Sequence, residues 1–94
     1  MHELEWSQAA RGDLLEIVSY IAEDNPDAAQ WLMNDINSAA MRLQEFPKMH
    51  RAGRVDGTRE VVVRSNYIVV YAEDEATVRI LRVLHAARQW PPDR

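Results

Sequence analysis

The sequence contains no cysteine, which excludes disulfides, thiolate nucleophiles and cysteine-based zinc sites. This absence fits a reducing compartment, and we expect a cytoplasmic protein. The N-terminus shows no basic segment followed by an apolar run, and no apolar run approaches the length that spans a membrane. We therefore expect neither a signal peptide nor contact with a membrane.

Several motifs that carry chemistry are also missing. The chain has no Walker-type phosphate loop, no dinucleotide fingerprint, no HExxH zinc motif and no serine in a nucleophile elbow. The histidines His2, His50 and His85 are scattered along the chain, so we expect no metal site from them. The sequence thus predicts no metal and no cofactor.

The 94 residues are enough for one domain, which we place at 1–94. Its net charge of −4 is unevenly distributed. Residues 1–47 hold nine acidic and two basic side chains, whereas residues 48–94 hold nine basic and six acidic ones. Such segregation is typical either of a surface that meets an anionic partner or of arginines that solvate an exposed sheet face.

Two amphipathic helices are predicted in the acidic half. Apolar side chains recur at helical spacing from Gln8 to Asp24, directly after Ser7, a good N-cap residue. Asn25-Pro26 breaks this helix and begins a second one, which runs to about Phe46 and is ended by Pro47. We expect the buried side of the second helix to carry Ala29, Leu32, Met33, Ile36, Ala40, Leu43 and Phe46.

Three short apolar runs follow, at Val61–Val63, Ile68–Tyr71 and Val78–Leu84, and they are rich in β-branched and aromatic residues. Together with a short first strand at Leu4–Trp6, they predict the order β-α-α-β-β-β. The fold class is therefore α+β, with an N-terminal helical hairpin packed on one face of a small antiparallel sheet. The other face of the sheet is expected to be partly open.

The turn between the first two of these runs sets the register of the sheet. A two-residue turn at Ser65-Asn66 would place Val63 opposite Ile68 and Val61 opposite Val70, on an aliphatic face that also includes Arg82. A slip by one residue would invert this assignment. In the predicted register, the open face carries Glu60, Val62, Arg64, Tyr67, Val69, Tyr71, Arg79 and His85.

The basic side chains of the loop, sheet and tail suggest one kind of chemistry. Cleavage of RNA through its own 2′-hydroxyl needs a group that takes that proton and cations that stabilise the charge on the phosphate. His85 is suited to the first task and the arginines to the second. The alternative is that His85 is a half-buried residue at the end of a strand and that the arginines are solvated.

Trp90-Pro91-Pro92 forms a stiff segment after the last strand. A tryptophan in such a place most often folds back to cover the edge of a core. The alternative is contact with a partner, because tryptophan is enriched among the residues that dominate binding energies.

Three stretches form a pattern that spans essentially the whole chain. The first is Asp13-Leu14, Ile17, Tyr20-Ile21-Ala22, Asn25-Pro26, Ala28-Ala29, Leu43 and Pro47. The second is Gly53-Arg54-Val55, Gly57-Thr58-Arg59-Glu60-Val61-Val62 and Tyr67-Ile68-Val69-Val70-Tyr71. The third and most specific is Ile80-Leu81-Arg82-Val83-Leu84-His85-Ala86-Ala87-Arg88-Gln89-Trp90-Pro91. Together these stretches resemble the RelE/ParE superfamily of bacterial type II toxins.

The resemblance implies a small toxin encoded beside an antitoxin, with which it forms a hetero-oligomer. An extended, partly helical acidic segment of the antitoxin would wrap the toxin until the antitoxin is degraded. RelE-like members of the superfamily cleave mRNA in the ribosomal A site. ParE-like members do not cleave RNA but poison DNA gyrase, which inhibits growth and stabilises plasmids.

This sequence resembles the ParE branch more closely. The chain is acidic overall and Lys48 is its one lysine, whereas a protein that binds ribosomal RNA and mRNA needs many phosphate contacts. We therefore favour a ParE-like inhibitor of DNA gyrase that acts by binding. The alternatives are a toxin that retains antitoxin binding alone and a RelE-like, metal-independent mRNA interferase. The catalytic residues of such an interferase would be Arg59, Arg82, His85 and Arg88.

The residues expected to bind the antitoxin or the target are Arg51, Arg54, Arg59, Arg64, Tyr71, Arg79, Arg82, His85, Arg88 and Trp90. We expect their guanidinium groups to gather on the exposed side, rim and tail of the sheet, where they would receive an anionic protein segment.

Overall fold

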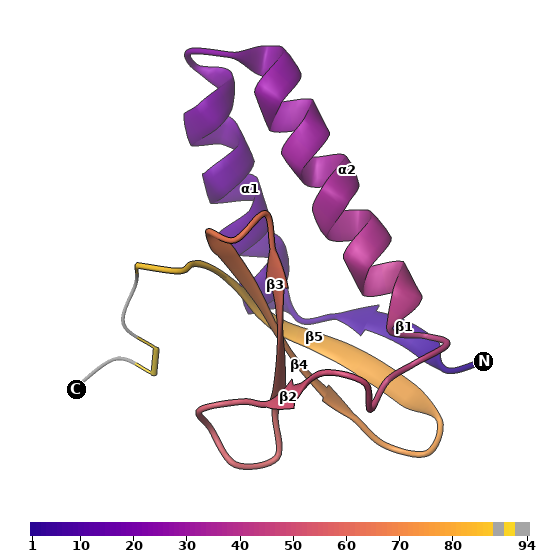
Figure 1. Cartoon of the computed structure of the whole chain (residues 1–94). Coiled ribbons are helices and arrows are strands. Elements are labelled where there is room, and N and C mark those ends of the chain that lie inside the picture. Colours follow the sequence, from indigo (N-terminus) through magenta and orange to yellow (C-terminus); the bar gives the residue numbers. More distant parts are fainter. Residues whose placement is uncertain (88–89, 92–94) are drawn as a thin grey trace.

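The computed structural model describes residues 1–87, 90 and 91 of the chain. Two helices and five strands follow one another in the order β1-α1-α2-β2-β3-β4-β5 (Figure 1). The α+β class and the predicted order are confirmed, and the structure adds the short strand β2 within the loop before β3. Within the described residues, neither helix is long and apolar enough to cross a membrane.

The helices begin at the predicted caps. The helix α1 spans Gln8–Ala22, and the Ser7 hydroxyl accepts a hydrogen bond from the backbone N–H of Ala10 at 3.0 Å. The helix α2 spans Pro26–Arg42, and the Asn25 side chain accepts from the N–H of Ala28 at 3.1 Å. Both caps satisfy backbone donors that have no partner within the helix.

The C-terminal end of α2 differs from the prediction. The helix ends at Arg42, about one turn before Phe46. The backbone N–H groups of Leu43 and Gln44 donate to carbonyls three residues earlier, which tightens the last turn and changes the direction of the chain. Leu43 remains buried as predicted, whereas Phe46 points outward and is 54% exposed. The prediction that Phe46 belongs to the core is therefore wrong.

The five strands form one sheet in the order β1-β5-β4-β3-β2. The strands β2 (Arg51–Ala52), β3 (Arg59–Val63), β4 (Tyr67–Glu73) and β5 (Thr77–His85) pair antiparallel, as predicted for the strands that follow the helices. The strand β1 (Glu3–Trp6) instead runs parallel to β5, so the sheet is mixed and not purely antiparallel. Parallel pairing needs a long connection, which the two helices and the strands β2, β3 and β4 together provide.

The predicted register is wrong by one residue. Three residues at 64–66 connect β3 to β4, so Val63 pairs with Tyr67 and Val61 with Val69. The left-handed conformation falls on Arg64 (φ 55°) and Ser65 (φ 59°), one position earlier than expected. The resulting turn also lets Arg64 reach Asp35 of α2.

This shift reverses the faces of β4. Tyr67, Val69 and Tyr71 pack towards the helices, whereas Ile68 and Val70 lie on the opposite side of the sheet, which we call the open face. Strand β5 contains a bulge where it pairs with β4: Val70 pairs with Arg82, whereas the next residue, Tyr71, pairs with Ile80. Leu81 is the extra residue of this bulge. It shifts the alternation of side chains along β5 by one position, so that Arg82 lies on the open face with Val70.

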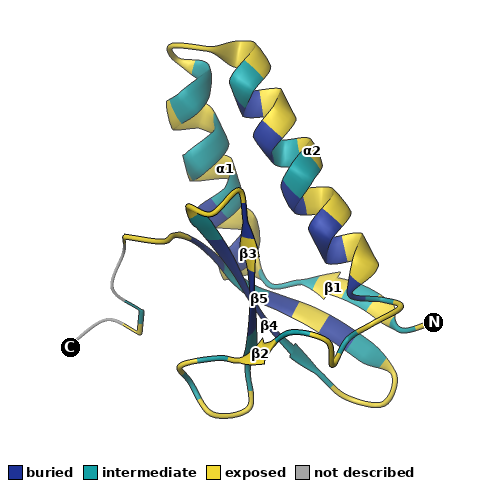
Figure 2. Cartoon of the chain, in the orientation of Figure 1, coloured by how far each residue is buried: buried dark blue, intermediate teal, exposed yellow. Residues whose placement is uncertain are grey.

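The main core lies between the helices and the sheet, where dark blue segments of both layers face each other (Figure 2). It contains Ala10, Leu32, Ile36, Ala39, Ala40, Leu43, Val61, Val63, Val69, Tyr71, Val78, Ile80 and Val83. A second, smaller cluster of Ile68, Val70 and Leu84 lies on the open face and is covered by Trp90. The open face is therefore partly closed by the chain itself.

We predict that Ile36→Ala lowers the free energy of unfolding by about 2–5 kcal/mol, because Ile36 is fully buried at the centre of the main core. Met41→Ala is the matched control, since Met41 lies on the exposed side of the same helix and should change this free energy by about 0.5 kcal/mol or less. Urea denaturation measures both. Equal losses would contradict the described placement of α2.

Candidate functional site

Arg82 is held by Asp13 of α1. Its Nε and Nη2 atoms donate to the two carboxylate oxygens at 2.7 and 2.9 Å, and the backbone N–H of Val83 donates to the same carboxylate at 3.0 Å. Asp13 is 8% exposed, so this ion pair is largely shielded from water. The hydrogen bond from Arg82 to Asp13 raises the pKa of Arg82, which keeps the guanidinium charged.

This contact also completes an edge of the sheet. Strand β1 pairs with β5 up to Trp6 and Ile80, so the following residues of β5 have a strand, β4, on one side alone. The Ser7 hydroxyl donates to the carbonyl of Leu81 at 2.9 Å, and Asp13 accepts from Val83 two residues further on. The first turns of α1 thereby satisfy backbone groups that an open edge would leave free.

Trp90 packs over Arg82 on the open face. The guanidinium carbon of Arg82 lies 5.4 Å from the ring centroid of Trp90, a cation–π contact. The ring also packs against the cluster of Ile68, Val70 and Leu84. The expectation that this tryptophan covers the edge of a core is confirmed.

Glu60 positions two further arginines on the open face, Arg51 and Arg54. This carboxylate is 2% exposed and accepts from Arg51 Nη2 at 3.2 Å and from the backbone N–H of Arg54 at 3.0 Å. The Nε of Arg54 lies 3.8 Å from the same carboxylate. Arg54 also donates to the carbonyl of Trp90 at 3.4 Å, which joins the loop after β2 to the C-terminal segment.

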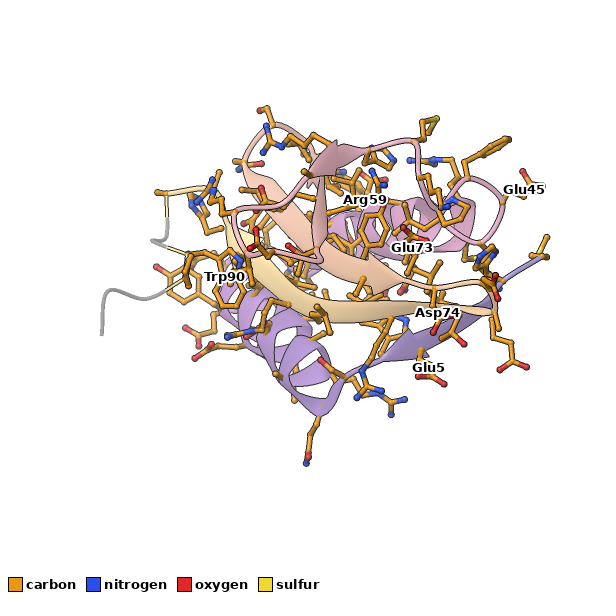
Figure 3. All side chains as sticks on the ribbon, turned by 90° about the horizontal axis from the view of Figure 1, so that it is seen from below. Glu5, Glu45, Arg59, Glu73, Asp74 and Trp90 are labelled. Atoms are coloured by element: carbon orange, nitrogen blue, oxygen red, sulfur yellow. The ribbon has the colours of Figure 1, made fainter. Side chains whose placement is uncertain are left out.

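Arg59 and Tyr71 lie on the helix side and hold the loop after α2. The Nη1 of Arg59 donates to the carbonyl of His50 at 2.8 Å, and its Nε lies 3.4 Å from Glu73. The Tyr71 hydroxyl donates to the carbonyl of Pro47 at 2.7 Å. Burial raises the pKa of Tyr71, which therefore stays a neutral donor. Figure 3 shows Arg59 and Glu73 together, well apart from Trp90.

The other predicted residues lie at separate places. Arg64 pairs with Asp35 of α2, and Arg79 pairs with Glu5 of β1 at 3.2 Å. His85 ends β5 and packs its ring edge-on against Tyr67, with 5.3 Å between centroids. Its Nδ1 accepts from the backbone N–H of Ala87 at 3.1 Å. Arg88 lies outside the described residues.

The arrangement of the charged side chains thus differs from the one expected from the sequence. It brings four of the predicted binding residues together on the open face: Arg51, Arg54, Arg82 and Trp90. Six arginines are each paired with a carboxylate of the same chain: Arg51, Arg54, Arg59, Arg64, Arg79 and Arg82. The expectation that the guanidinium groups gather on one surface is therefore wrong for Arg59, Arg64 and Arg79. Of the six pairs, three use carboxylates of the acidic half and three use Glu60 or Glu73 of the basic half.

Sequence reasoning missed the carboxylates that position the arginines. Asp13 interrupts an apolar helical stripe, three residues after Ala10, and a charge in such a stripe was the available signal. Glu60 has a similar signal, since it sits in a strand next to three valines and yet is almost fully buried. Buried charges are normally paired, so both positions pointed to a cationic partner.

The candidate nuclease residues do not converge. Arg59 lies opposite Tyr71 and His85 opposite Tyr67, so roughly 13 Å of strand separates the two positions. Arg82 lies on the other side of the sheet, bound to Asp13. Among the described residues, no group of three histidine, aspartate or glutamate side chains could hold a metal ion.

Known proteins resemble this chain both in sequence and in fold. The chain is 38% identical over 88 residues to the protein Y4kP of Sinorhizobium fredii, an alignment covering 94% of this chain and 92% of that one. It is 35% identical over 88 residues to toxin RelE2 of Caulobacter vibrioides, covering 94% and 99%. The fold matches a chain of the chromosomal ParDE system of P. aeruginosa with a TM-score of 0.80 and 21% identity, covering 90% and 96%.

The helical hairpin and the mixed sheet are thus those of the RelE/ParE superfamily of toxins. Within it, the model of the ParE toxin of type II toxin–antitoxin systems matches residues 4–90. The chain belongs to this ParE toxin family.

We predict that Asp13→Asn lowers the free energy of unfolding by about 3 kcal/mol, because it leaves the Arg82 charge without its shielded partner. Glu5→Gln is the matched control, since its pair with Arg79 is about half exposed and should contribute about 0–1 kcal/mol. Urea denaturation again provides the comparison. Similar losses in the two variants would mean that the Asp13 pair is an ordinary surface pair.

A further prediction concerns His50, whose pKa is lowered first by burial and second by the charge of Arg42. The unfolded chain therefore binds a proton at His50 more readily than the folded one. The contribution of neutral His50 to the free energy of unfolding is complete above its ordinary pKa of 6.5 and declines as the pH falls below that value. We expect His50→Gln to lose less stability than the parent between pH 7.5 and 5.5, as measured by urea midpoints. Identical pH slopes would contradict this assignment.

Proposed function

We propose that this toxin inhibits DNA gyrase by binding it, does not cleave RNA, and is neutralised by a cognate antitoxin. The observation that carries the proposal is the separation of Arg59, Arg82 and His85. A metal-independent nuclease needs its proton acceptor and its phosphate-binding cations around one scissile bond. Here Arg59 binds loop carbonyls, Arg82 binds Asp13, and His85 lies at the far end of β4 and β5 from Arg59.

Membership of the ParE toxin family supports gyrase as the target, since gyrase poisoning is what resemblance to the ParE branch implies. The charge balance agrees with this proposal. A net charge of −4, with six arginines engaged inside the chain, leaves few cations for phosphates of ribosomal RNA.

An antitoxin partner is supported by the family and by the structural neighbour, which comes from a ParDE system. On this protein, the open face around Trp90 is a suitable contact region. It combines an apolar cluster with Arg51 and Arg54, which are about half exposed and oriented by Glu60, and with the less exposed Arg82, which is oriented by Asp13. An acidic segment of the antitoxin could share these guanidinium groups without having to order them.

Two assays with the purified full-length chain test the proposal. We expect inhibition of supercoiling by purified gyrase, reversed when the antitoxin is added, and no cleavage of ribosome-bound mRNA. Unhindered supercoiling together with cut mRNA would contradict the proposal and favour the interferase alternative. In that case His85→Ala is the control for contaminating nuclease, because loss of an acid–base group should lower cleavage by about 100-fold or more.

If both assays are negative and expression leaves bacterial growth unchanged, the gyrase proposal is equally contradicted. The chain would then be a toxin that retains antitoxin binding alone. Co-purification with the antitoxin distinguishes that outcome from a misfolded preparation.

A further inference from the structure

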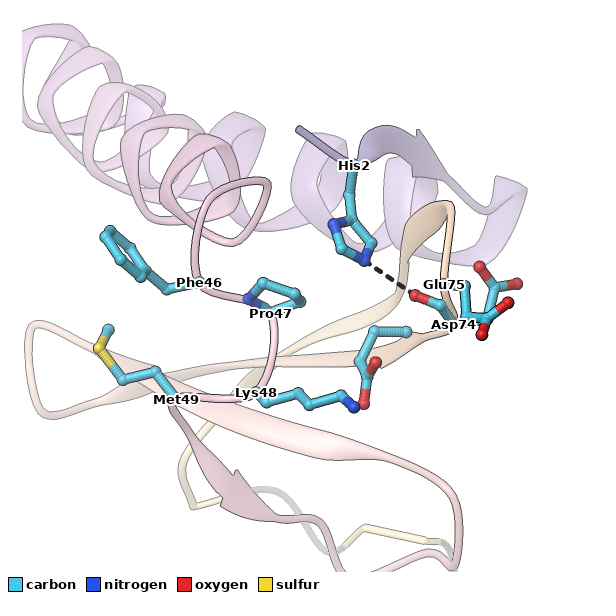
Figure 4. Close-up of a pocket in the computed structure, with 8 residues that line it drawn as sticks. His2, Phe46, Pro47, Lys48, Met49, Asp74 and Glu75 are labelled. Atoms are coloured by element: carbon cyan, nitrogen blue, oxygen red, sulfur yellow. Dashed lines mark hydrogen bonds between the residues drawn. The ribbon is translucent and has the colours of Figure 1, made fainter.

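A pocket of about 930 Å³ lies between the loop after α2 and the turn that joins β4 to β5. It is lined by His2, Phe46, Pro47, Lys48, Met49, Glu73, Asp74 and Glu75 (Figure 4). Phe46 and Met49 stand beside each other at one side, and Asp74 and Glu75 at the other. Phe46 is 54% and Met49 62% exposed, so large apolar side chains at the pocket are open to solvent.

The loop wall of the pocket is firmly held. The buried Tyr71 donates to the carbonyl of Pro47, and Arg59 donates to the carbonyls of Lys48 and His50. These hydrogen bonds hold the loop backbone in a course that directs Phe46 and Met49 away from the core. Their exposure is therefore a feature of the fold and not of a loose loop.

The opposite wall is also fixed. The Asp74 carboxylate accepts hydrogen bonds from the N–H groups of Ala76 and Thr77, both at 2.8 Å. The Nε2 atom of His2 lies 2.9 Å from the carbonyl oxygen of Asp74, and this contact links the β4–β5 turn to the segment that precedes β1. A pocket with two fixed walls loses little entropy when a ligand enters, which favours binding.

Carboxylates outnumber cations around this pocket. Three of the lining residues are acidic, Glu73, Asp74 and Glu75, and the last two are exposed on the turn. The hydrogen bonds from Ala76 and Thr77 lower the pKa of Asp74, so that it stays ionised in mildly acidic solution. Lys48 is the one lysine of the chain, and Glu73 is paired with Arg59. The field at the pocket mouth therefore attracts positive charge.

We infer that this pocket binds a basic amphipathic segment of a protein partner. An apolar side chain of the segment would lie against Phe46, Pro47 and Met49, and its lysine or arginine residues would face Asp74 and Glu75. Methionine adapts its shape to different apolar groups, which suits such a surface. The inference does not depend on gyrase being the target, and the partner has the opposite charge to the acidic segment expected from the sequence.

A second copy of this chain fits the pocket less well. In a two-fold symmetric contact the same patch of both protomers meets, so a patch in which carboxylates outnumber cations meets the same excess of negative charge on the other protomer. Like charges placed together in this way oppose association. Self-association is therefore an outcome of the test that would overturn the inference.

The test uses the full chain and two fluorescent helical peptides, one with leucine and lysine at amphipathic spacing and one with glutamate in place of lysine. Fluorescence anisotropy should show the leucine–lysine peptide binding about tenfold or more tightly than its acidic counterpart. Its affinity should fall as salt is added, because the charges involved are exposed. Equal affinities of the two peptides would overturn the inference.

Variants locate the binding site. Phe46→Ser should weaken binding of the leucine–lysine peptide by about tenfold, as expected for an apolar anchor. Leu15→Ser is the matched control, because Leu15 is 68% exposed on α1 and does not line the pocket. Equal weakening by both variants would show that the peptide binds any exposed apolar surface. Sedimentation that reveals a dimer, lost in Phe46→Ser, would show that a second copy occupies the pocket.

Discussion

The carboxylate of Asp13 is the contact on which the arrangement of helix and sheet depends. It accepts hydrogen bonds from the Arg82 guanidinium and from the backbone of Val83, so one acidic group joins α1 both to a side chain and to the edge of β5. A carboxylate this well buried requires such partners. The bulge in β5 brings Arg82 to the open face, and Trp90 then covers it. Helix, strand and C-terminal segment are thereby connected through one ion pair.

Folding largely cancels the charge asymmetry of the sequence. The acidic N-terminal half supplies Glu5, Asp13 and Asp35, and each of them meets an arginine of the basic half. The arginines are therefore oriented before any partner arrives, and several remain half exposed. A surface of this kind can exchange or share its ion pairs with an incoming charged segment of a protein partner.

Two distinct surfaces result from this arrangement. The open face combines oriented arginines with Trp90, whereas the end of the molecule near the β4–β5 turn combines exposed Phe46 and Met49 with carboxylates. Their charges are opposite, so they suit partners of different composition.

The sequence by itself determined the elements and their order, because helix caps at Ser7 and Asn25, apolar periodicity and β-branched runs act over a few neighbouring residues. It also pointed to the family and to Trp90 as a cover for the core. Only the tertiary structure decided the sheet register, the outward turn of Phe46 and the partner of each arginine. These features depend on residues far apart in the chain: a three-residue turn in place of two reverses every side chain of β4, and Asp13 meets Arg82 only after the sheet has formed.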